Sequence, residues 1–85
     1  MVKELFYVVG RPSCPYCVKA KDLLEERGLN YEFRNLENNR ELMLEYVNKF
    51  KWDTVPMVFH FDEHGEHKFL GGFSGLVDFL DSEAT

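Results

Sequence analysis

The sequence predicts an α/β fold in which three helices flank a four-stranded mixed sheet, in the order β-α-β-α-β-β-α. Two observations along the chain predict it. Short apolar runs alternate with segments of helical apolar spacing through the first two thirds of the sequence, and a five-residue polar turn separates the last two runs. A strand–helix–strand unit implies parallel pairing, whereas a short turn between strands implies an antiparallel hairpin, so both kinds of pairing are expected in one sheet.

The first strand and helix are the clearest elements. Glu4 to Val9 is apolar on both faces, as in a central strand covered on both sides. Residues 10–13 predict a turn because they include glycine, proline and serine. A helix is expected from about Pro15 to Arg27, since proline is tolerated early in a helix and Gly28 provides a stop.

The middle of the chain continues the alternation. Asn30 to Asn35 alternates aromatic and polar residues, which predicts a strand less buried than the first. Arg40 to Phe50 has apolar residues at helical spacing, and Asn38 or Asn39 can cap that helix. Residues 53–56 predict a loop.

The last third predicts a hairpin followed by a helix. Met57 to Phe61 and Lys68 to Leu70 have strand character, and residues 62–66 have turn chemistry. The two glycines at positions 71–72 end the second of these strands. From Phe73 onward the apolar spacing is again helical.

Length and composition limit the class of protein. Eighty-five residues form one domain, residues 1–85, and 45% apolar content is enough for one core. The net charge of −5 argues against nucleic acid as a partner. The only early apolar run, Leu5–Val9, is too short for a signal peptide or a membrane span. Two cysteines are too few for a disulfide-stapled secreted domain. We therefore expect a cytoplasmic monomer without a membrane partner.

Cys14 and Cys17 are the strongest functional signal. The first lies at a predicted helix N-terminus, where backbone N–H groups and the helix dipole favour a thiolate, and Arg11 and Lys19 can add positive potential. The second lies three residues on, on the same helical face and on the core-facing stripe. We expect Cys14 to attack a disulfide, and Cys17 to be partly buried, to stay a thiol and to resolve the mixed disulfide. Pro15 then restricts the loop between them.

Three motifs carry a specific resemblance. Arg11-x-x-Cys14-Pro15-Tyr16-Cys17, Thr54-Val55-Pro56 and Gly71-Gly72-Phe73-Ser74 follow in that order. Together they resemble a dithiol glutaredoxin, a member of the thioredoxin-like superfamily. The resemblance implies an enzyme that reduces protein disulfides and glutathione mixed disulfides, with glutathione as the reducing co-substrate and no bound cofactor. Electron donation to ribonucleotide reductase is a role of the family and a hypothesis here.

The resemblance also implies a glutathione site. In the family the proline of the second motif is cis and faces the cysteines, one glutathione carboxylate lies on the backbone N–H groups that begin the last helix, and the other meets basic groups. The matching positions here are Arg11, Tyr16, Thr54, Val55, Pro56, Gly72, Phe73 and Ser74. We interpret Trp52, which is outside these motifs, as a core or groove-rim residue.

One position departs from the family pattern. An aspartate, which pairs with the α-amino group of glutathione, commonly follows the last motif, and this chain has Gly75. We therefore expect weaker glutathione affinity than in a relative with aspartate. Two alternatives stay open: a thioredoxin-like donor reduced by thioredoxin reductase, and a non-catalytic module that binds a metal or a partner.

A zinc site is the remaining alternative for the cysteines. His60 and His64 complete a Cys-x2-Cys…His-x3-His string with Cys14 and Cys17. However, 42 residues separate Cys17 from His60, where a zinc finger has about 12–15. We therefore predict no metal site.

Overall fold

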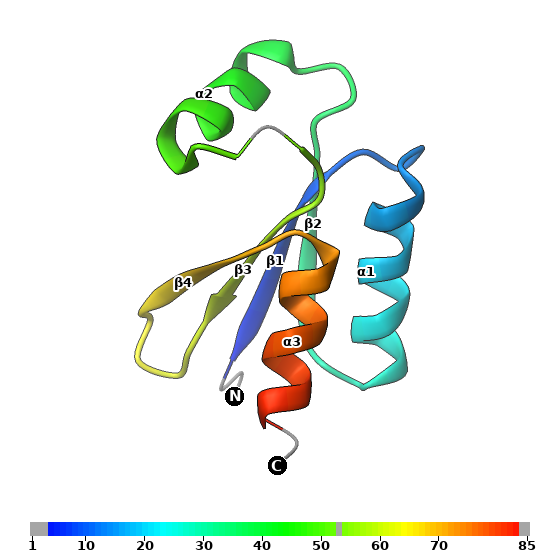
Figure 1. Cartoon of the computed structure of the whole chain (residues 1–85), viewed down its shortest axis with the longest axis vertical. Coiled ribbons are helices and arrows are strands. Elements are labelled where there is room, and N and C mark those ends of the chain that lie inside the picture. Colours follow the sequence, from blue (N-terminus) through cyan, green and yellow to red (C-terminus); the bar gives the residue numbers. More distant parts are fainter. Residues whose placement is uncertain (1–3, 53, 84–85) are drawn as a thin grey trace.

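The computed structural model of the chain describes residues 4–52 and 54–83, and it has the predicted order of elements (Figure 1). Asp53, which belongs to the predicted loop, is outside the described residues. The elements are β1 (Leu5–Gly10), α1 (Pro15–Glu26), β2 (Tyr31–Asn35), α2 (Arg40–Phe50), β3 (Met57–Phe61), β4 (His67–Gly71) and α3 (Phe73–Glu83).

Most boundaries agree with the sequence prediction within one residue. Gly28 follows α1 with φ of 67°, a left-handed conformation that suits glycine at a helix end. Asn39 is the N-cap of α2, and its side chain accepts a hydrogen bond from the Leu42 N–H at 3.1 Å. The last strand is longer than predicted, because His67 and Gly71 also pair with β3.

The strands form one mixed sheet in the order β2-β1-β3-β4. β1 pairs with β2 in parallel and with β3 antiparallel, and β3 and β4 form the expected antiparallel hairpin. β1 is therefore a central strand, as its apolar faces predict. The edge strand β2 is less buried than β1, which is also as predicted.

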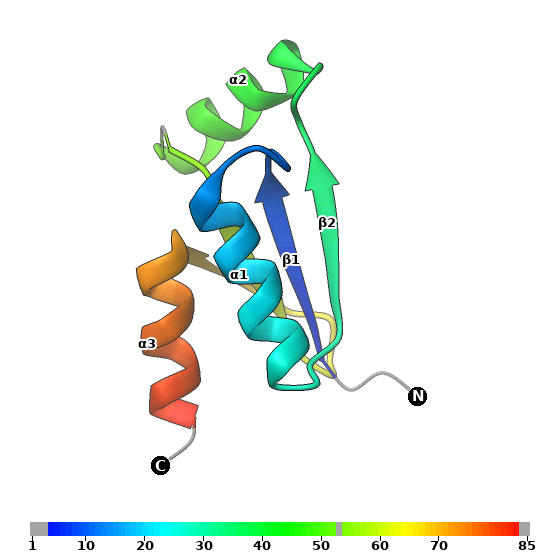
Figure 2. The same cartoon turned by 90° about the vertical axis from the view of Figure 1, so that its right-hand side faces the viewer.

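The helices cover the sheet unequally. α1 and α3 lie side by side against one face, where Phe6, Val8 and Val58 pack with Leu24 and Leu76 (Figure 2). The other face carries an aromatic cluster. α2 covers that cluster from the end of the sheet at which β1 ends (Figure 1). Its members are Tyr7, Tyr46, Phe50, Trp52, Phe59, Phe61 and Phe69.

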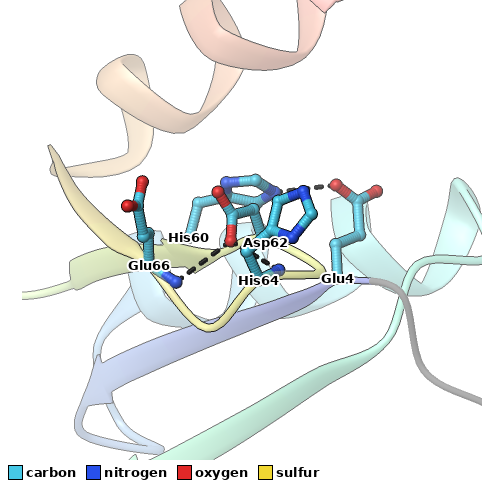
Figure 3. Close-up of polar contacts among 5 residues, drawn as sticks. All are labelled: Glu4, His60, Asp62, His64 and Glu66. Atoms are coloured by element: carbon cyan, nitrogen blue, oxygen red, sulfur yellow. Dashed lines mark hydrogen bonds and ion pairs between the residues drawn. The ribbon is translucent and has the colours of Figure 1, made fainter.

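Polar contacts hold the opposite end of the sheet (Figure 3). Asp62 Oδ1 accepts hydrogen bonds from the backbone N–H groups of His64 and Glu66, at 2.9 and 3.0 Å, which closes the hairpin turn. His60 Nε2 lies 2.7 Å from Glu4 Oε2, so β3 is joined to the residue before β1. These contacts are structural, because they lie at the far end of β1 from the cysteines.

None of the described helices combines the length and the apolar character that crossing a bilayer requires.

Candidate active site

Cys14 begins the helix that carries both cysteines. It is the N-cap residue of α1, with extended backbone angles (φ −82°, ψ 122°), and its side chain makes no capping hydrogen bond. Its carbonyl accepts the first helical hydrogen bond, from the Val18 N–H at 3.1 Å. Its own N–H donates to the Arg11 carbonyl at 3.1 Å, which closes the turn after β1. The sulfur is partly exposed and free to react.

The surroundings of Cys14 favour its thiolate. Desolvation by itself raises the pKa of Cys14, but the backbone N–H of Cys17, the Cys17 thiol, the Tyr16 N–H and the charge of Arg11 together lower it below its usual value. Unpaired N–H groups at a helix N-terminus stabilise negative charge in this way. Arg11 therefore acts as predicted. Lys19 instead places its Nζ 5.1 Å from the centroid of the Tyr16 ring.

Cys17 has the opposite environment. It is fully buried, more than the partial burial we expected, because it packs on β1 as well as within α1. Burial raises the pKa of Cys17 to about 11, and the hydrogen bond from the Arg11 N–H to Cys17 Sγ, at 3.5 Å, offsets only part of that effect. Cys17 is therefore a thiol at neutral pH. This is the state that we predicted for a resolving cysteine.

Gly10 is a residue of the site that the sequence analysis missed. We interpreted it as part of a turn, but it is the last residue of β1, and a Cβ there would overlap Cys17 Sγ. The absence of a side chain lets the helix bring Cys17 onto the strand. The available signal was a glycine at the end of an apolar strand, four residues before the first cysteine.

The loop before β3 faces the attacking sulfur. Cys14 Sγ lies 3.8 Å from the Val55 carbonyl oxygen, and the Val55–Pro56 peptide bond is cis, as the resemblance implies. Pro56 is buried, and its Cα lies 3.7 Å from the position of a Cβ on Gly10. The second motif is thus brought beside both cysteines from a segment about forty residues away.

A groove of about 480 Å³ lies beside this loop. It is lined by seven of the eight residues that we assigned to glutathione, with Trp52 as an additional wall. Arg11 is exposed and is not part of the lining. The lining residues are Tyr16, Trp52, Thr54, Val55, Pro56, Gly72, Phe73 and Ser74. Trp52 is therefore a groove residue, in agreement with its interpretation as core or rim.

The first turn of α3 forms one end of the groove. α3 begins at Phe73, so the backbone N–H groups of Phe73 and Ser74 are at its N-terminus, which is favourable for an anion. A Cβ on Gly75 would overlap the carbonyl oxygen of Leu70. This packing explains the departure from the family pattern, because the backbone leaves no room there for the side chain of an aspartate.

The cysteine–histidine string does not form a site. Gly10 contacts Cys17, whereas His60 pairs with Phe6, four residues earlier on β1, which separates them by about 13 Å at the usual rise of a strand. His64 is exposed in the hairpin turn. Among residues 4–52 and 54–83, no three histidine, cysteine or acidic residues are placed to hold a metal ion.

A second hollow, of about 300 Å³, lies between α2 and the sheet. It is lined mainly by Tyr46, Phe50, Phe59 and other members of the aromatic cluster, whereas Val55, which contacts Cys14, lines the first groove. The chemistry of the site therefore belongs to the groove beside Cys14.

Comparison with known proteins agrees with this geometry. The glutaredoxin family model matches residues 4–65. A probable glutaredoxin of Acanthamoeba polyphaga mimivirus is 32% identical, over 95% of this chain and 79% of that protein. The solution structure of a dithiolic glutaredoxin of Trypanosoma brucei brucei is 30% identical, with a TM-score of 0.71, over 93% of this chain and 78% of that one.

A glutaredoxin–glutathione complex from buckwheat has the same fold. Its TM-score is 0.75 at 21% identity, over 92% of this chain and 69% of that chain. Three findings agree on one family. They are the arrangement of the strands and helices, the paired cysteines beside a cis-proline loop, and the match to the family model. This chain belongs to the glutaredoxin family of thiol–disulfide oxidoreductases.

Proposed function

We propose that this protein is a glutathione-dependent oxidoreductase that reduces protein disulfides and glutathione mixed disulfides through Cys14 and Cys17. The observation that carries the proposal is the placement of the two sulfurs: Cys14 is partly exposed beside Val55, which lines the groove, and Cys17 is buried one turn further along the same helix. The pKa of Cys14 is lowered and that of Cys17 is raised to about 11. Cys14 is therefore available as the nucleophile, and Cys17 stays protonated until it resolves the mixed disulfide.

The reaction proceeds in two exchanges. The Cys14 thiolate attacks one sulfur of the substrate disulfide, a Cys14–substrate disulfide forms, and the other substrate sulfur leaves as a thiolate that takes up a proton. Cys17 then loses its proton and attacks the Cys14 sulfur, which closes a Cys14–Cys17 disulfide and releases the second substrate thiol. The substrate gains two electrons and the protein loses two, and two molecules of glutathione restore the dithiol.

Glutathione as the reductant is supported by the groove. The N–H groups that begin α3 and the Ser74 hydroxyl offer donors to a carboxylate, and the backbone of Val55, a lining residue, can pair with a short extended peptide. The buckwheat relative in this fold is a complex with glutathione. We further propose a cytoplasmic monomer that has ribonucleotide reductase among its substrates. The dithiol motif is the only support for that substrate, and turnover of a matched reductase in vitro tests it.

A thioredoxin-like donor, reduced by thioredoxin reductase, is the second candidate. The observation that favours it is Gly75, where the packing against Leu70 excludes the carboxylate that would hold the amino group of glutathione. Reduction of insulin with each recycling system in turn separates the two candidates, because only the functional reductant sustains turnover.

The deciding experiment is a coupled assay with glutathione, glutathione reductase and NADPH on the mixed disulfide of glutathione and mercaptoethanol. We expect turnover in the wild type and a loss of roughly 10³-fold or more in Cys14→Ser, because the nucleophile is removed. Cys17→Ser should keep part of this activity, since glutathione can release the product from Cys14 directly. Ser13→Ala, an exposed neighbour, is the matched control. No turnover in the wild type, or equal loss in the two cysteine variants, contradicts the proposal.

A further inference from the structure

The groove beside Cys14 has aromatic walls. The rings of Tyr16 and Phe73 lie 6.0 Å apart with an interplanar angle of 38°, and Trp52 provides a third ring. None of the described residues that line the groove carries a charge. A glutathione site needs only donors and a few polar contacts, so these three rings are more apolar surface than that ligand, with its two carboxylates and one amino group, can use.

The aromatic walls are held in position by the fold. Trp52 packs on the glycines that follow the last strand: a Cβ on Gly71 would lie 3.4 Å from its Cη2, and one on Gly72 would lie 3.6 Å from its Cζ2. Its ring also meets Phe69 edge-on, with centroids 5.5 Å apart. Because an aromatic wall of fixed orientation loses little entropy on binding, it is suited to take up an apolar side chain.

The occupant follows from the reaction. Only one sulfur of a substrate disulfide can react with Cys14 at a time. Val55, whose carbonyl lies beside Cys14 Sγ, is also a lining residue of the groove. An extended substrate chain rises about 3.3 Å per residue with alternating side chains, so the side chain two residues from the substrate cysteine lies on the same side as that cysteine, over the groove. Away from the first turn of α3, a charged side chain would lose water without gaining a charged partner among the described lining residues.

We propose that this groove selects polypeptide disulfides that carry an aromatic or large aliphatic side chain two residues from the cysteine, and that Trp52 is the residue that determines this specificity. The inference rests on the proposed function, because it takes Cys14 as the attacking residue. Cys14 forms a disulfide with the peptide sulfur and releases the small thiol on the other side. Cys17 then closes on Cys14 and releases the peptide thiol.

The test is a single-turnover assay with the pre-reduced protein and short peptides, each joined through its one cysteine to mercaptoethanol. The peptides differ only in the residue two positions from the cysteine, which is phenylalanine, alanine or aspartate. Because mercaptoethanol is too small to fill the groove and no recycling system is present, the rate reports on the peptide alone. We expect the phenylalanine peptide to react roughly tenfold faster than the alanine peptide and the aspartate peptide to be slowest.

The variants separate this specificity from general reactivity. In Trp52→Ala the ratio of phenylalanine to alanine rates should fall to near one, whereas Trp52→Phe should keep most of it. Leu44→Ala, on the exposed face of α2 and outside the groove, should leave the ratio unchanged. Equal rates for the three peptides in the wild type overturn the inference but leave the proposed function intact. A failure to react with any of them, and with bis(2-hydroxyethyl) disulfide, overturns both.

Discussion

Cys14 and Cys17 are one turn apart on the same helix, and their surroundings move their pKa values in opposite directions. Desolvation raises the pKa of Cys14 at the N-cap, but the nearby backbone N–H groups of Cys17 and Tyr16, together with the charge of Arg11, outweigh it, so the pKa is lowered. Cys17 is fully buried against Gly10 at the end of β1, and burial raises its pKa to about 11. Both residues are cysteines, so the difference in pKa arises from how deeply each sulfur is buried and from which backbone groups it faces.

This comparison shows how one structural element supports two roles. A helix N-terminus stabilises only the charge that its unpaired N–H groups can reach, and their influence falls off within the first turn. The packing of that turn against the sheet removes the second sulfur from water. As a result, the two sulfurs lie one turn apart on the same helix and yet differ strongly in reactivity.

The largest expected effect is selective alkylation. Neutral pH is about four units below the pKa of Cys17, so about one Cys17 in 10⁴ is ionised there. Cys14 has a lowered pKa and a partly exposed sulfur, so its thiolate persists to lower pH than an ordinary thiol. Iodoacetamide at pH 7 should therefore modify Cys14 alone, as peptide mass mapping of the reduced protein would show.

The rate of alkylation should depend on pH in opposite ranges for the two cysteines. Alkylation of Cys14 should slow as pH falls through its pKa, because the thiolate is protonated, and alkylation of Cys17 should become appreciable only as pH approaches 11. The protein denatured in urea is the control, in which both cysteines should react alike. Comparable modification of the two cysteines in the folded protein at pH 7 would contradict the assigned environments.

A smaller effect is expected where the helix meets the strand. In Gly10→Ala the new methyl group overlaps Cys17 Sγ, so α1 must shift. Overpacking of this kind costs about 1–3 kcal/mol in the free energy of unfolding. Closure of the Cys14–Cys17 disulfide should slow as well, because Cys17 is displaced. Urea titration measures the stability, and acid-quenched trapping of the oxidised form measures the closure rate.

The control for Gly10 is a glycine with open space around it. A Cβ on Gly65 meets nothing within 4 Å, although its φ of 84° makes alanine unfavourable there. Gly65→Ala should therefore cost roughly 1 kcal/mol from backbone strain and leave closure of the disulfide unchanged. If the Cys14–Cys17 disulfide closed at the normal rate in Gly10→Ala, the position of Cys17 would not depend on the absence of a side chain at residue 10.

The sequence was informative wherever chemistry is local. The order of elements follows from apolar spacing, and the CxxC position follows from the change of a strand pattern into a helical one. The roles of Gly10 and Gly75 were missed because each depends on an atom distant in the sequence or on a fold-specific backbone path: Cys17 Sγ for the first and the Leu70 carbonyl for the second. A glycine says that a side chain is absent but not which atom occupies its space.

Arg11 contributes to the site in a way that the sequence indicates only in part. The resemblance assigns it to glutathione, which stays a prediction, and the structure shows an exposed side chain outside the groove lining whose charge lowers the pKa of Cys14. Arg11 therefore acts in two ways: its N–H donates to Cys17 Sγ, and the charge of its guanidinium acts to lower the pKa of both cysteines. Only the second contribution can be removed by changing the side chain.

The smallest expected effect follows from that separation. In Arg11→Gln burial still dominates at Cys17, so the pKa of Cys17 stays raised with or without the Arg11 charge, while the pKa of Cys14 rises towards its usual value because one favourable charge is lost. Alkylation at mildly acidic pH should slow by roughly two- to threefold, since an exposed charge acts weakly through solvent. The difference should shrink in 0.5 M salt, where screening reduces such effects to short range. Arg34→Gln, exposed on β2, is the control. If the slowing in Arg11→Gln were unaffected by salt, the side chain would act by ordering the turn before Cys14 rather than by its charge.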